Sequence, residues 1–130
     1  MNSAPIRTFK DLIVWRRAFD LVVEIYRLPR EFPKHELYGL SSELRKTSRS
    51  SLYNIAEGHK RKNTREYIHF LRISAGSAAE LESQILLSET LGYLQENAAE
   101  RIRNMLSEID RMLDSLIRSL KSKLLPPNPL

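Results

Sequence analysis

Residues 39–58 read GLSSELRKTSRSSLYNIAEG, and this stretch decides the fold that we predict for the chain. Apolar or small side chains recur along it at the spacing of one face of an α-helix. They are Leu40, Leu44, Ser48, Leu52 and Ile55. Gly39 and Gly58 bracket the segment, and Gly58 suits the left-handed position that closes many helices. We therefore expect a helix whose packing face carries small side chains in its middle.

A second face of the same predicted helix is cationic and aromatic. At about 100° per residue, four side chains fall together on the flank of the packing face. They are Arg45, Lys46, Arg49 and Tyr53. We expect the rest of the chain either to cover the packing face or to extend the cationic one.

This stretch and the motifs around it resemble a known family. The motifs inside it are Leu40-Ser41-Ser42-Glu43-Leu44-Arg45, Ser50 and Asn54-Ile55-Ala56-Glu57-Gly58. The flanking motifs are Phe9-Lys10-Asp11-Leu12-Ile13-Val14-Trp15, Ala18, Ile25-Tyr26, Phe32-Pro33 with Glu36, and Gly76-Ser77 with Glu80-Leu81-Glu82. The ordered set covers about residues 9–94 and resembles the four-helix-bundle family named after proteins encoded in intervening sequences of bacterial 23S ribosomal RNA genes.

The resemblance carries expectations about assembly and partners. Members of that family form ring-like homo-oligomers, typically pentamers, without enzymatic activity of their own. One relative is the accessory protein of diversity-generating retroelements, where it binds nucleic acid and a reverse transcriptase. By resemblance we expect a homopentamer that binds nucleic acid, with a reverse transcriptase as a further partner.

Length and composition fit a single helical domain. The 130 residues suit one domain, which we place at 1–130 with a loose arm at 1–8 and an extended tail at 126–130. Hydrophobic residues make up 42% and charged residues 28%, and no apolar run approaches the about 20 residues that span a bilayer. Residues 1–5 lack a basic start followed by an apolar core, which predicts no secretory signal, and the chain has no cysteine for disulfides or thiolate metal sites. We expect a cytoplasmic bacterial protein.

Positive charge is concentrated in one part of the chain. The formal net charge is +5, but residues 45–72 alone carry eight Lys or Arg against two acids, a net of +6, so the remainder sums to −1. This asymmetry predicts an anionic partner, nucleic acid first and an acidic protein second.

Three further helices are predicted from periodicity. The first has the apolar stripe Leu12, Trp15, Ala18, Phe19, Val22, Ile25 and Tyr26, and should end before Pro29. A connection at 29–33 follows, which we expect Phe32 to pin to the bundle. A later helix should start at the capping pattern Asn63-Thr64-Arg65-Glu66 and stop at Gly92.

The middle of that later helix, Ser74–Ala79, has almost no side-chain bulk. A glycine at its centre, Gly76, costs about 1 kcal/mol of helix propensity, so we expect a close helix contact there, with the small side chains of Thr47, Ser48 and Ser51 opposite. The last helix should be capped by Asn97-Ala98-Ala99-Glu100. Its apolar stripe is Ile102, Met105, Leu106, Ile109, Met112, Leu113, Leu116, Leu120 and Leu124. Four helices with short turns predict an all-α, antiparallel up-down-up-down four-helix bundle.

The residues offer little basis for catalysis. Glu66-Tyr67-Ile68-His69 has the Glu-x-x-His form of a di-iron site, but such a site needs two of these motifs and the chain has one. The glycines are too far apart to cradle a phosphate, and no serine has a nucleophile-elbow setting. Asn54 and Glu57 are interpreted as structural rather than catalytic. We predict no catalytic, metal or cofactor-binding residue, and no enzyme.

The basic cluster is the strongest functional indication. The predicted nucleic-acid-binding residues are Arg45, Lys46, Arg49, Tyr53, Lys60, Arg61, Lys62 and Arg65. No recognition-helix motif is present, so RNA or DNA would be bound mainly through phosphates, with Tyr53 available for stacking. Two alternatives stay open: an ordinary solvated helix face, or a scaffold whose basic edge docks an acidic protein or the reverse transcriptase. Trp15 is expected to be a core or subunit-interface anchor rather than a stacking platform.

Overall fold

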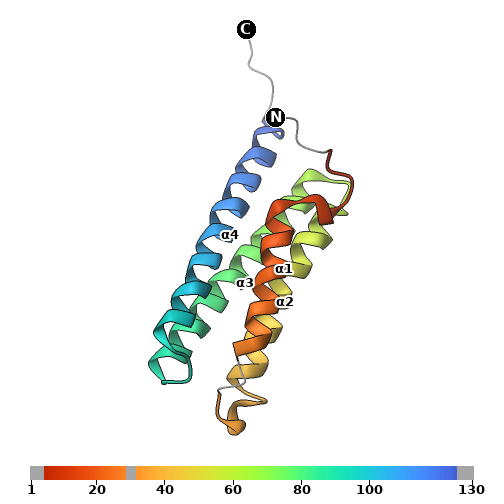
Figure 1. Cartoon of the computed structure of the whole chain (residues 1–130). Coiled ribbons are helices and arrows are strands. Elements are labelled where there is room, and N and C mark those ends of the chain that lie inside the picture. Colours follow the sequence, from red (N-terminus) through yellow and green to blue (C-terminus); the bar gives the residue numbers. More distant parts are fainter. Residues whose placement is uncertain (1–4, 29–31, 126–130) are drawn as a thin grey trace.

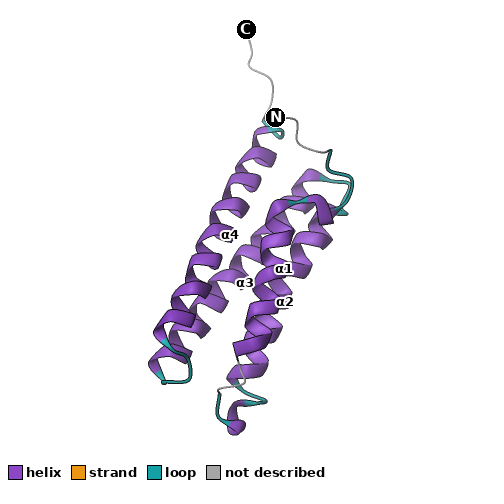
Figure 2. Cartoon of the chain, viewed as in Figure 1, coloured by secondary structure: helices purple, strands orange, loops and turns teal. Residues whose placement is uncertain are grey.

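The computed structural model describes residues 5–28 and 32–125, and every regular element in that part of the chain is helical (Figure 2). The main helices are α1 (Ile13–Arg27), α2 (Leu40–His59), α3 (Thr64–Thr90) and α4 (Glu96–Ser122). Short 3₁₀ helices, η1 (Phe9–Asp11) and η3 (Lys34–Glu36), precede α1 and α2. The predictions for Pro29, for the start of the arm at 1–4 and for the tail at 126–130 lie outside the described residues.

The four main helices form a bundle around a leucine- and isoleucine-rich core, which confirms the predicted fold class. Two ion pairs, each with an N–O distance of 2.9 Å, join Arg17 to Glu108 and Arg101 to Glu24. Residue numbers rise along α1 as they fall along α4 in these pairs, so the two helices are antiparallel. In Figure 1 the chain direction alternates from each helix to the next.

Helices α2 and α3 meet along a strip of small hydroxyl side chains. The Oγ atoms of Ser51 and Ser74 lie 3.0 Å apart, and Ser74 Oγ is 2.8 Å from the backbone oxygen of Ser51. Beside this pair, the hydroxyls of Ser50 and Ser77 are 2.9 Å apart. These contacts confirm that the two small surfaces meet. We call this strip the serine seam.

The helical glycine that packs tightly against the other helix of this pair is Gly58 and not Gly76. A Cβ on Gly58 would lie 2.9 Å from Phe70 Cβ and 3.2 Å from the backbone oxygen of Tyr67. A Cβ on Gly76 would meet nothing within 4 Å, so the expected close contact at that glycine is wrong. Gly58 does not close its helix either, because α2 continues to His59. Among the described residues only Gly92 has a positive φ, of 80°, which confirms it as the stop of α3.

The predicted stripe of α1 is confirmed in part, because Leu12, Ala18 and Ile25 are buried and Trp15 and Val22 pack against the core. The face in the core consists of Val14, Ala18, Leu21 and Ile25. On the predicted stripe, Phe19 and Tyr26 are 47% and 40% exposed. Trp15 is half-buried, with its ring centroid 5.2 Å from that of Phe9 and 5.3 Å from that of Phe19. The spacing of apolar residues shows where a helix is apolar. Which of those residues become buried depends on how the neighbouring helices pack against it.

The helix ends give mixed outcomes. Asn63 Oδ1 accepts hydrogen bonds from the backbone N–H groups of Arg65 and Glu66 at 2.8 and 3.2 Å, which confirms the cap of α3. The cap at Asn97 is wrong, since α4 begins at Glu96 with Gln95 before it. Burial of Leu94 on one side and Ala99 on the other fixes where the chain enters this helix.

The inner face of α4 follows the predicted stripe up to Leu120, although the helix ends at Ser122, before Leu124. Phe32 is buried with its ring centroid 5.4 Å from that of Tyr93, which confirms that it pins the connection before α2. Within the described residues, no helix combines the length and apolar character needed to cross a bilayer.

We predict that replacing each helical glycine with alanine changes the free energy of unfolding in opposite directions. Gly58→Ala should lower the free energy of unfolding by about 1–3 kcal/mol, because the new methyl group overpacks the contact with Phe70 and Tyr67. Gly76→Ala should raise it by about 0.4–1 kcal/mol, because alanine favours the helix and meets open space. Urea denaturation of both variants measures the difference. A stabilised Gly58→Ala variant would contradict the close α2–α3 approach.

Candidate nucleic-acid interface

The outward flank of α2 carries the first group of predicted site residues. Burial of Leu44 and Ile55 against the core turns this flank to solvent, where Lys46 is exposed and Tyr53 is 60% exposed. Arg45 and Arg49 lie beside them and are half-buried. The predicted flank is therefore present as a surface of α2.

Tyr26 of α1 orients both arginines of this flank. The guanidinium carbon of Arg45 lies 5.2 Å from the centroid of the Tyr26 ring. Arg49 Nη1 donates a hydrogen bond to the Tyr26 hydroxyl, and this bond raises the pKa of Arg49 above its ordinary value. Both guanidinium groups are thus held in place while they remain charged. The sequence pattern had assigned Tyr26 to the core stripe and so did not connect it to the arginines.

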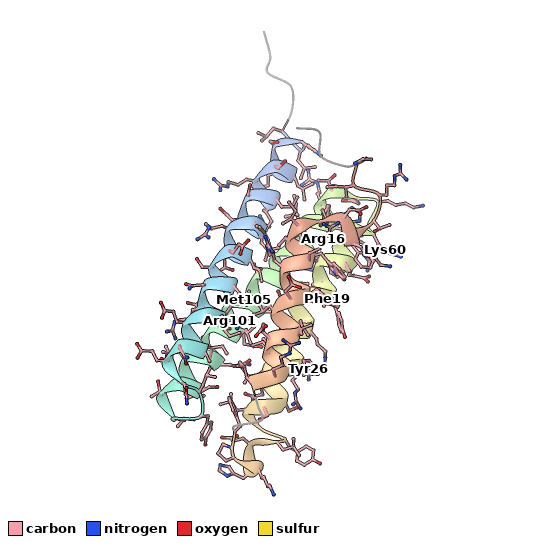
Figure 3. The ribbon with its side chains drawn as sticks, viewed as in Figure 1. Arg16, Phe19, Tyr26, Lys60, Arg101 and Met105 are labelled. Atoms are coloured by element: carbon pink, nitrogen blue, oxygen red, sulfur yellow. The ribbon has the colours of Figure 1, made fainter. Side chains whose placement is uncertain are left out.

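The second group lies at the α2–α3 turn, at some distance from the first. Lys60 follows Arg49 by 11 residues, which is about 16 Å along a helix. In Figure 3 Lys60 lies near the end of the bundle where α2 finishes, whereas Tyr26 lies toward the other end of α1. The eight predicted residues therefore extend over the outward flank of α2 and into the turn that follows it.

Arg61 differs from its neighbours in the turn because a carboxylate balances its charge. Its Nη2 pairs with Glu57 of the preceding helical turn, and its guanidinium carbon lies 4.7 Å from the centroid of the Phe70 ring. Lys60, Lys62 and Arg65 are exposed and form no ion pair within the described residues. Among the predicted cations, Arg61 is the one whose charge a carboxylate already balances within the described residues.

Two cations that the sequence did not assign to the site join Arg65. Arg72 on α3 and Lys121 on α4 line the same opening as Arg65, with a volume of about 420 Å³. Ile68 and the two leucines after α4, Leu124 and Leu125, form its apolar wall. Five exposed cations that form no ion pair within the described residues make up what we call the basic end of the bundle: Lys60, Lys62, Arg65, Arg72 and Lys121. Lys121 is distant in sequence, so only the packing of α3 on α4 could identify it.

The polar residues considered for chemistry have local roles in the structure. Asn54 Nδ2 donates to the Ser50 backbone oxygen at 2.8 Å, and Glu57 pairs with Arg61, so the structural interpretation of Asn54 and Glu57 is confirmed. Glu66 and His69 are exposed, and the His69 ring centroid lies 5.5 Å from that of Phe70. No group of three or more His, Asp or Glu side chains in the described residues is placed to hold a metal ion. Burial raises the pKa of Tyr67 to about 12, so this phenol beside Gly58 stays neutral at physiological pH.

The fold and this surface define a small four-helix-bundle protein with a basic end. Residues 10–115 match the model of the 23S rRNA-intervening sequence protein family, and the chain belongs to that family. The resemblance seen in the sequence is thereby confirmed. Neither the family nor its description indicates an enzyme.

One solved structure gives independent support for the fold. It is the crystal structure of a protein of unknown function from the S23 ribosomal protein family of Bacteroides thetaiotaomicron. It superposes with a TM-score of 0.76 at 23% identity, covering 82% of this chain and 96% of that one. No curated protein matches this chain.

Proposed function

We propose that this protein is a non-enzymatic, homo-oligomeric accessory protein that binds nucleic acid, RNA or DNA, through the basic end. The observation that carries the proposal is the convergence of Arg65, Arg72 and Lys121, from two helices, on one opening without a carboxylate partner among the described residues. Like charges placed together repel one another, so such a group is best stabilised by an anion.

The position of the opening fits a polyanion. Lys60 and Lys62 lie in the turn directly before α3, and Arg65 lies in its first turn. A nucleic-acid backbone presents closely spaced phosphates, which this row of cations could contact one after another. Contacts of this kind position the nucleic acid and carry little sequence preference.

Assembly of identical subunits would strengthen such contacts. We propose a ring, with the pentamer of the resembling family as its expected size. In a ring the basic end is repeated around an axis, and weak individual contacts then add up through high effective concentration.

A protein-binding scaffold is the alternative function. It is favoured by an apolar groove of about 800 Å³ between residues 5–14 and α4, which includes Ile13, Met112 and Leu116. Exposed apolar surface of this kind often marks a contact with another protein. The partner would be an acidic protein or a reverse transcriptase.

Salt dependence tests the nucleic-acid proposal. The affinity for a labelled structured RNA and for a duplex DNA should fall steeply between low and moderate salt, because binding releases counterions. Arg72→Ala combined with Lys121→Ala should weaken binding, because fewer phosphates are then neutralised. The slope of log affinity against log salt should become shallower by about 0.7–0.9 for each phosphate that the variant no longer neutralises.

A matched double variant controls for charge alone. Lys34→Ala with Arg111→Ala removes the same charge from exposed positions outside the basic end. It should change binding much less than Arg72→Ala with Lys121→Ala. Equal losses of affinity in the two double variants would contradict the assignment of the basic end, and no binding of either nucleic acid at low salt would refute the function.

The oligomer is tested by the mass of the protein in solution. Light scattering at micromolar concentration should give a mass near 75 kDa, five times the 15.1 kDa of the chain. A monomer at that concentration would count against the ring and against binding that depends on repeated contacts.

A further inference from the structure

The face between α1 and α2 exposes four aromatic rings. Tyr38 is 93% exposed, Tyr53 60%, Phe19 47% and Tyr26 40%. Rings of this size gain stability from burial, so several of them exposed on one face indicate a surface that a partner covers. Figure 3 labels Phe19 and Tyr26 at different levels along α1, so the rings extend along this face.

Two hollows divide this face, and they share a wall. The Tyr38 hollow, of about 350 Å³, is lined by Tyr26, Leu37, Tyr38, Ser42, Arg45 and Arg49. The Tyr53 hollow, of about 540 Å³, includes Phe19, Val22, Leu52 and Tyr53. Tyr26 and Arg49 line both hollows and are joined by their hydrogen bond. Both volumes lie within the range of about 300–1,000 Å³ that is usual for small-molecule sites.

Each hollow combines an exposed tyrosine with a guanidinium group. Among the described residues, no carboxylate lines either hollow. Arg45 lines the Tyr38 hollow with its guanidinium over the Tyr26 ring, and it forms no ion pair within the described residues. Its positive charge is therefore available to an anion that enters this hollow.

This combination of groups distinguishes single-stranded from duplex nucleic acid. Aromatic rings beside cations bind single strands, because each unpaired base has an open face for stacking while the phosphates contact the cations. In a duplex the base faces are already stacked on one another, so a tyrosine cannot reach them.

We propose that the nucleic acid bound by this protein is single-stranded, with one base against Tyr38, a base further along the same strand against Tyr53, and an intervening phosphate at Arg49. This inference rests on the proposed function and names its substrate class. Tyr26 is a positioning residue here, because it holds Arg45 and Arg49 in place.

The test compares a short labelled single strand that cannot fold on itself with the same strand annealed to its complement. Fluorescence anisotropy at low salt should show tighter binding of the single strand. Tyr38→Ala and Tyr53→Ala should each weaken single-strand binding roughly 5- to 150-fold, the range expected when one base can no longer stack, and leave duplex binding unchanged. Tyr38→Phe and Tyr53→Phe should bind like the unchanged protein, since stacking does not need the hydroxyl.

Two controls make the result specific. Leu87→Ala removes an exposed apolar side chain from α3, outside both hollows, and should have no effect. A strand of the same length with abasic sites keeps the phosphates and should bind the unchanged protein and Tyr38→Ala equally.

The outcomes separate this inference from the function on which it rests. Equal affinity for single strand and duplex, with no effect of the tyrosine variants, would overturn the inference and leave the nucleic-acid function standing. A lower mass of the oligomer in the Tyr38→Ala variant would also overturn it, because the hollow would then be a subunit contact. Failure of both nucleic acids to bind at low salt would refute the function itself.

Discussion

The close approach of α2 and α3 is the constraint on which the rest of this structure depends. Along the serine seam, hydroxyls bond across the two helices, and at Gly58 there is no space for even a methyl group beside Phe70. A buried hydroxyl that loses its partner costs about 1–3 kcal/mol, and a bulkier side chain would push the helices apart. The seam therefore fixes both the spacing of the two helices and the rotation of α2 about its axis.

The surface of the protein follows from that rotation. With one side of α2 held against α3 and another buried in the core, the flank that carries Lys46 and Tyr53 has to face solvent. Helix α1 then packs beside this flank and supplies Tyr26, whose ring and hydroxyl hold Arg45 and Arg49. The antiparallel arrangement also brings the end of α4 beside the start of α3, which places Lys121 with Arg65 and Arg72. Packing thus produces both the aromatic face and the basic end.

The sequence predicted the features that depend on local periodicity and missed those that depend on neighbours. Stripes in α2, α3 and α4 located the helices, because an amphipathic helix of that length repeats its pattern many times. In α1 two apolar faces compete, and nothing local shows that Val14 and Leu21 are buried while Phe19 and Tyr26 are exposed. The two glycines show the same limit, since a glycine in a helix has one sequence pattern whether it is crowded or open. Within the site, the sequence pattern grouped Arg61 with the other cations of the turn and showed neither its pairing with Glu57 nor the meeting of Arg65 with Lys121.

Backbone hydrogen exchange with and without a bound single strand tests the central claim most directly, because it reports on every helix in one experiment. The claim is that the serine seam holds α2 so that its flank, together with the basic end, forms the binding surface. We predict that the free protein exchanges most slowly along α2 and α3 at the seam. Added single strand should slow exchange further at residues 37–62 and at the end of α4, and leave the middle of α3 unchanged. Fast exchange at the seam, or protection confined to the outer face of α3, would contradict this account.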